Sequence, residues 1–240
     1  MAAGHGKDTA VHVNGRNMST YLQGANVEMA AQVEDATVMS STAEKCHGGL
    51  YSGGLSAKGL FDGATAAVDQ IFNAALISSS QSLIIAWIIG ETAVGAIGYA
   101  MRARATQYKN TSPVNGLVAC ALNARADEGV ERVKSLHPLA AETSATNGTT
   151  LDDTAATTAG AAAYLTVTAF TGTSITVTVQ DSADGSTWAA VTGMAFAAAS
   201  AAGTSERVAT SATATIRRYV RVTWTGTFTS ATFSVAFARK

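Results

Sequence analysis

Two short segments carry residues that could bind a metal ion. Cys46 and His47 are adjacent, and the run Asp181-Ser-Ala-Asp-Gly185 has the start of a calcium-binding loop. Neither set is complete, because no second Cys or His lies near Cys46 and the Asp run lacks a further acidic ligand at the required distance. The Asp run is more typical of a hairpin turn. We therefore expect no metal site.

Patterns typical of an enzyme do not stand out elsewhere in the chain. We find no GxSxG sequence, no phosphate-binding glycine loop and no prominent carboxylate pair. The Gly pairs at 48–49 and 53–54 lack the residues that follow in a nucleotide-binding loop, and Trp188 and Trp224 are more typical of core positions than of ligand platforms. We expect a protein that is not an enzyme and uses no cofactor.

The composition argues against several classes of partner. Charged residues make up only 14% of the 240 residues and the net charge is −1, so we expect no basic patch for tight nucleic-acid binding. Abundant Gly, Ala, Thr and Ser with little charge suits a surface covered by neighbouring subunits, although a low-charge monomer is an alternative. The first residues lack the apolar run of a signal peptide, and the run 83–89 is too short to cross a bilayer. With two cysteines only, we expect folding in a reducing cytoplasm.

One helix is expected between two groups of strands. Apolar residues recur at helical spacing from Ala64 to Leu76, and Asp62 is placed to cap the helix. The segment from Glu34 to Gly54 has no periodicity and reads as a long irregular loop. Alternation of apolar and polar residues predicts strands at 9–14, 24–32, 55–60, 82–89, 95–107 and 114–126, with a polar coda at 130–136.

The composition changes at Pro138. Residues 139–160 are mostly Ala, Thr, Ser, Gly and Asn, which is typical of a linker. About seven short strands follow from Ala161, which suggests a small antiparallel β-sandwich. We thus expect a mainly β chain with a first domain at 1–138, a linker at 139–160 and an accessory β-sandwich domain at 161–240.

Two phrases in the first half resemble those of a known family. His12-Val-Asn-Gly-Arg-Asn-Met-Ser-Thr-Tyr-Leu22 and Leu55-Ser-Ala-Lys-Gly-Leu-Phe-Asp-Gly63 are similar to conserved phrases of the tail tube (major tail) proteins of long-tailed bacteriophages. The chain departs from them at Asn14, at Met18 and at the Ala-Lys pair inside the second phrase. The resemblance covers about residues 5–137. The second half has phrases similar to discoidin-like carbohydrate-binding sandwiches, but a hairpin and a core strand common to many sandwiches explain them better.

The resemblance implies a tail-tube-type β-sandwich/barrel and a structural role in the virion. Tail tube proteins form hexameric rings that stack into a hollow tube, through which genomic DNA passes without specific binding. The implied partners are further copies of the chain, the tape measure protein, the tail terminator and baseplate proteins, with no membrane contact and with assembly in the bacterial host cytoplasm. The alternatives are another virion component, such as a capsid decoration or tail-completion ring protein, and a carbohydrate-binding module.

The same resemblance assigns roles to several residues. The irregular loop corresponds to the segment that reaches the adjacent ring. Alternation in the strand at 24–32 then places Glu28 and Gln32 on the lumenal face and Val27 and Met29 toward the core. A cationic lumen would hold DNA back. Arg102 and Arg104 are therefore either neutralised across the wall by carboxylates such as Glu28 or, as we expect, located at subunit interfaces. The residues expected to contact the adjacent ring are Glu34, Asp35, Lys45, Leu50 and Tyr51.

Overall fold

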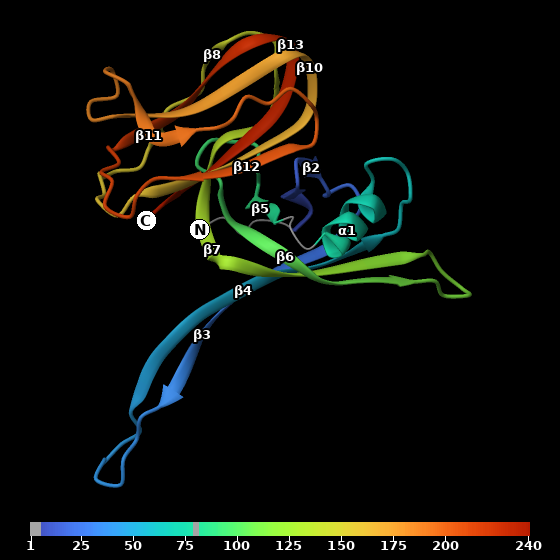
Figure 1. Ribbon diagram of the computed structural model, residues 1–240, viewed down its shortest axis with the longest axis vertical. Coiled ribbons are helices and arrows are strands. Elements are labelled where there is room, and N and C mark those ends of the chain that lie inside the picture. Colours follow the sequence, from blue (N-terminus) through green and yellow to red (C-terminus); the bar gives the residue numbers. More distant parts are fainter. Residues whose placement is uncertain (1–5, 79–81) are drawn as a thin grey trace.

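The computed structural model describes residues 6–78 and 82–240, and these residues are mostly strands (Figure 1). Residues 1–5 lie outside this description, and so does the expectation that the first residues are not a signal peptide. A short 3-10 helix, η1 (Gly6–Asp8), precedes the first strand, and one α-helix, α1 (Val68–Ile77), follows the fourth. The expected mainly β fold with one packed helix is confirmed.

The first half holds seven strands. They are β1 (Thr9–Val13), β2 (Arg16–Asn17), β3 (Leu22–Asp35), β4 (Cys46–Leu60), β5 (Leu83–Ile89), β6 (Ile97–Thr111) and β7 (Ala119–Glu142). Neighbouring strands are antiparallel in the order β3-β4-β7-β6-β5-β1. Helix α1 covers one face of this sheet, where Phe72 is fully buried and its ring meets that of Tyr108 edge-on at 5.9 Å. Apolar alternation in the strands and the stripe on the helix thus build one core.

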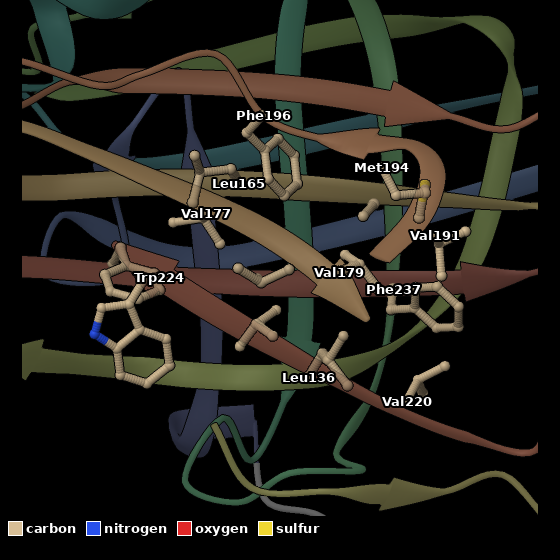
Figure 2. Close-up of a cluster of buried hydrophobic side chains, with 14 of the residues drawn as sticks. Leu136, Leu165, Val177, Val179, Val191, Met194, Phe196, Val220, Trp224 and Phe237 are labelled. Atoms are coloured by element: carbon tan, nitrogen blue, oxygen red, sulfur yellow. The ribbon is translucent and has the colours of Figure 1, made fainter. Parts of the chain in front are cut away.

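The second half is a compact sandwich around a larger core. Its strands are β8 (Thr146–Asn147), β9 (Leu151–Asp152), β10 (Ala161–Ser182), β11 (Ala189–Ala195), β12 (Thr204–Ala209) and β13 (Tyr219–Arg239). The long strands β10 and β13 pair along almost their whole length. Figure 2 shows Val177, Val179 and Trp224 pointing into this core together with Leu136 from β7.

Strand β7 joins the two halves and departs from the expected boundary. It runs without a break through Pro138, and its last part pairs with β13. The polar segment 130–136, which was predicted to follow the last strand of the first domain, is therefore part of strand β7. Glu128 and Gly129 have positive φ angles of 76° and 90°, and they lie where the pairing of β7 with β6 shifts register, as in a β-bulge.

Residues 139–160 do not form a free linker. The first of them belong to β7, while β8 and β9 pair with β13. The indole Nε1 of Trp224 donates a hydrogen bond of 2.9 Å to the carbonyl of Ser144. Side chains of the segment also contribute, because the Asp152 carboxylate pairs with Arg218 and the Asp153 carboxylate with Arg239. The division into two domains stays a prediction.

Two further local expectations need correction. Helix α1 begins at Val68 rather than Ala64, and its N-cap Ala67 makes no side-chain cap. The Asp62 carboxylate instead accepts a hydrogen bond from the Ala64 amide at 2.9 Å, which stabilises the turn before the helix. Within the segment expected to be an irregular loop, only residues 36–45 lie outside the strands of a hairpin.

A partly buried charged cluster links the two halves. Burial alone would raise the pKa of Glu131, but hydrogen bonds from Arg207, Tyr164 and Lys240 outweigh this and lower it. The guanidinium of Arg207 lies 2.8 Å from the Glu131 carboxylate and the Lys240 ammonium 2.9 Å from it. A charge removed from water is costly unless it is paired. Separation of the two halves would leave Glu131 of β7 without Arg207 and Lys240, so the cluster stabilises their contact.

Candidate assembly interface

The β3–β4 hairpin extends far from the body of the molecule (Figure 1). At its base Leu55 and Ala57 are buried under α1, but further out Met29 is 56% exposed and Tyr51 is 83% exposed. An isolated two-stranded ribbon is at best marginally stable in water. The outer part of the hairpin therefore lacks a core of its own.

The hairpin has an apolar face and a polar face. The cross-strand pairs Val27–Leu55, Met29–Gly53 and Ala31–Tyr51 alternate with pairs such as Glu28–Gly54. Side chains of directly opposed residues lie on one side of the sheet, so the first three pairs continue the buried face outward. Val27 does pack against the core as expected, whereas Met29 lies beyond it.

The tip of the hairpin is an ordered turn. The Ala36 amide donates to the Lys45 carbonyl at 2.7 Å, and the Lys45 amide donates to the Thr37 hydroxyl at 2.9 Å. The hydroxyl and amide of Thr37 hydrogen-bond to the Asp35 carboxylate and lower its pKa. Val38 and Met39 are exposed at the end of this turn.

All five residues predicted to reach an adjacent ring lie on this hairpin. Glu34 and Asp35 end β3, Lys45 closes the tip, and Leu50 and Tyr51 are exposed on β4. Their proposed contact with another copy stays a prediction. The sequence analysis missed Val38 and Met39, although two adjacent apolar residues in a polar segment were a usable signal.

A hydrogen-bonded polar row crosses the four-stranded part of the sheet on its other face. The Ser56 hydroxyl donates to the Asn123 carboxamide oxygen at 2.6 Å, and the Asn123 amide group donates to Gln107 at 2.9 Å. This row links β4, β7 and β6 without apolar side chains between them. The sheet face opposite α1 is therefore polar and suited to contact with water. We call it the polar, or wet, face.

The polar face carries several exposed cations in addition to Glu28. Strand alternation places Glu28 on this face, where Lys58, Arg125 and Lys109 are also exposed. Arg104 lies opposite Arg125 and so shares the same face. Cations outnumber Glu28 because β4, β6 and β7 each contribute at least one. The lumenal role of Glu28 and Gln32 stays a prediction.

Arg102 already has carboxylate partners within its own chain. Its guanidinium Nε lies 3.5 Å from the Asp127 carboxylate, and it also forms an ion pair with Glu128. Arg104 lies on the outermost strand of this part of the sheet, and its place at a subunit interface stays a prediction.

Two strand edges of this sheet pair with no described strand. β3 pairs only with β4, and the part of β6 beyond Ala103 pairs only with β7. The register places Leu22 in one row with Asn110, and Val27 in one row with Ala105. The two open edges therefore lie at matching levels of a four-stranded sheet and run antiparallel to each other. Open edges of this kind are templates for pairing with another chain.

A groove runs beside the open edge of β3. It has a volume of about 580 Å³ and is lined by Leu22 to Asn26 on one side, by Thr9 and Val11 of β1 on the other, and by Trp87. The tip between β6 and β7 carries the exposed apolar residues Val114, Leu117 and Val118. In Figure 1 this second arm leaves the body in a different direction from the β3–β4 hairpin.

The candidate ligand sites in the second half are structural. The Asp184 carboxylate accepts hydrogen bonds from the amides of Thr187 at 2.8 Å and Ser186 at 2.9 Å, which lower its pKa. This confirms the hairpin turn predicted for the Asp run. Among residues 6–78 and 82–240 no group of three or more His, Cys, Asp or Glu side chains could hold a metal ion. Trp224 is buried as predicted, whereas Trp188 is only half-buried, with the Arg221 guanidinium 4.1 Å from its ring centre.

None of the helices in the described part of the chain has the length and apolar character needed to span a membrane.

Comparison with known proteins gives distant structural likenesses only. No protein-family model matches the sequence, and no curated protein matches it. A chain in the virion of a native gene transfer agent (GTA) particle is 18% identical, with 54% of this chain and 98% of that chain covered at a TM-score of 0.45. A chain in the tail of an empty GTA particle with C6 symmetry is 19% identical, with coverage of 53% and 97% and a TM-score of 0.42. The Dit protein of SPP1, which belongs to the hub adsorption apparatus of a phage infecting Gram-positive hosts, is 12% identical, with coverage of 96% and 98% and a TM-score of 0.38. At scores this low, the function has to be argued from the chain itself.

Proposed function

We propose that this chain is a structural, non-catalytic subunit of a phage-type tail and that its copies join edge to edge into a ring. The observation that carries this is the pair of open edges on β3 and β6. They are antiparallel, so β6 of one copy can pair with β3 of the next and continue an antiparallel sheet. Repeating this heterologous contact around an axis closes a barrel and leaves no edge exposed.

The finer form of the proposal is a hexameric ring that stacks into a hollow tail tube within the virion. The two sequence phrases support it, as does the separation of the sheet into an apolar face under α1 and a wet face. In this arrangement the wet face lines the lumen. The β3–β4 hairpin, with its exposed apolar face, reaches the adjacent ring. Tape measure, terminator and baseplate proteins would meet the ends of such a tube.

The proposed lumen carries cations, and this has a consequence for DNA passage. Lys58 and Arg125 are exposed on the wet face and can contact phosphates. Because phosphate contacts release counterions, we expect DNA retention by assembled tubes to fall as salt rises. Filter binding of short duplex DNA to tubes at low and high salt measures this. Retention that does not respond to salt would contradict a lumen of this charge.

Negative-stain microscopy of the purified chain tests the proposed function. Long tubes with an open centre are expected. Closed single rings would favour another virion component, such as a tail-completion ring, and monomers at every concentration would overturn edge-to-edge assembly. A carbohydrate-binding module would instead remain monomeric and bind glycans through the pair of Trp188 and Arg221.

A further inference from the structure

We propose that the groove between β1 and β3 receives the tip of the β6–β7 arm, residues 112–118, from the next copy in the ring. This inference rests on the proposed function, because it assumes that the open edge of β6 lies beside that of β3. It adds where the arm ends and which side chains hold it. The occupant is therefore a second copy of the same chain.

The handedness of the sheet determines on which side the next copy lies. The Leu60 amide donates to the Tyr21 carbonyl beside β3, and the Phe61 amide donates to the Val118 carbonyl beside β7. For L-residues this order means that, viewed from the face under α1 with β3 pointing up, β4, β7 and β6 lie successively to the left of β3. The next copy's β6 must then lie to the right of β3.

Closure into a barrel shifts the register across this joint. Barrel strands tilt by about 35–45° in a right-handed sense, and four strands span about 19 Å. Within one copy, paired residues of β3, β4, β7 and β6 form rows across the sheet. The next copy's β6 is displaced along the strand direction by about four to six residues from the position that such a row would give it. The right-handed tilt directs this displacement toward the C-terminal end of β6. The residues level with Leu22 to Asn26 thus become the last residues of β6 and the arm tip.

The groove suits the tip in size and in polarity. Its volume of about 580 Å³ is enough for several aliphatic side chains, and Val11, Leu22 and Trp87 supply apolar walls. On the arm, Val114 is fully exposed and Leu117 is 71% exposed in the single chain. Residues 111–118 carry no charge, so the tip itself brings no ion into the groove, whose lining includes the polar residues Lys7 and Ser19.

The same displacement brings opposite charges together at the joint. Within one copy Lys109 is in the row of Gly24, four residues before Glu28. A shift of about four residues places Lys109 of the next copy beside Glu28. Both side chains are exposed on the wet face of their own chain. Charge complementarity therefore supports the same register as the fit of the tip.

Disulfide trapping tests the location of the tip. In a background with Cys46→Ser, the double variant Gln23→Cys and Val114→Cys is assembled and then oxidised. We expect a ladder of covalent oligomers that extends to the full ring on non-reducing gels. The two single-cysteine variants are the matched controls, because they can form dimers but no ladder. Cys120 is buried and stays in place.

Microscopy of the same samples separates the two hypotheses. Rings or tubes without a ladder would overturn the docking of the tip while the proposed function stands. Absence of any ring or tube from the unmodified chain would overturn the proposed function itself. A ladder in the double variant supports both.

A charge exchange tests the register without any cysteine. The single variants Glu28→Lys and Lys109→Glu place like charges at the joint, and each should raise the concentration needed for assembly about tenfold. The double variant should return it close to that of the unmodified chain. A double variant that assembles no better than the single ones would overturn this register. Circular dichroism of each monomer checks that the exposed changes leave the fold intact.

Discussion

Strand β7 passes through two regions that are completed in opposite ways. Its second part contributes Leu136 to a core that β10, β13 and β11 of the same chain also build. Its first part lies in a sheet with two unpaired edges and two arms that carry exposed apolar residues. The second half thus buries its apolar side chains within its own chain. The first sheet reaches a comparable state only with other copies of the chain.

Truncation of an aromatic side chain in each region should show this difference most strongly. Phe233 is fully buried in the second core, so Phe233→Ala should lower the free energy of unfolding by about 3–5 kcal/mol. Tyr51 is 83% exposed on the hairpin, and Tyr51→Ala should change it by no more than about 0.5 kcal/mol. Urea unfolding of the two monomeric variants gives both values. Similar losses would mean that the hairpin already has a core in the single chain.

The junction between the regions should lose stability in acid. The lowered pKa of Glu131 means that its carboxylate stabilises the folded chain above its unfolded pKa of about 4.3, and that this contribution disappears as pH falls through the lower folded pKa. Glu131→Gln should therefore cost about 1.5–3 kcal/mol at neutral pH. The cost should shrink as the pH is lowered below about 4.

Thermal unfolding across this pH range measures the effect at the junction. Glu44→Gln, at the exposed hairpin tip, is the matched control and should leave the profile unchanged. If Glu131→Gln and the unmodified chain lose stability in parallel from pH 7 to pH 3, the cluster does not control the junction.

The smallest expected effect is a difference in backbone protection along one hairpin. Amides of β3 and β4 near Leu55 lie under the core, whereas those near Leu50 belong to an exposed ribbon. Hydrogen exchange of the monomer should thus be slow at the base and fast toward the tip. Assembly should slow exchange at the tip. Equal exchange at the tip in monomer and assembly would remove the hairpin from the contact.

Local patterns were enough to predict the strands, the helix and several turns. Alternation identified the core face of β4, with Leu55 and Ala57 buried, and helical spacing identified the stripe of α1 that buries Phe72. The turn near Asp184 was also predicted correctly, because Asp and Gly form such turns through hydrogen bonds to residues two or three positions away. These features depend on neighbours in the sequence, so the sequence shows them.

The sequence by itself determined the mainly β class, the single packed helix and the apolar stripes that form the two cores. Only the tertiary structure decided the rest: that β7 runs through Pro138, that residues near Ser144 are held by β13, and that the segment before Gly54 is a hairpin. The physical reason is that these features depend on backbone hydrogen bonds between distant strands. Ala, Thr, Ser and Gly can make such bonds as well as any other residue, so their composition looks like a linker or a loop until a partner strand lies beside them.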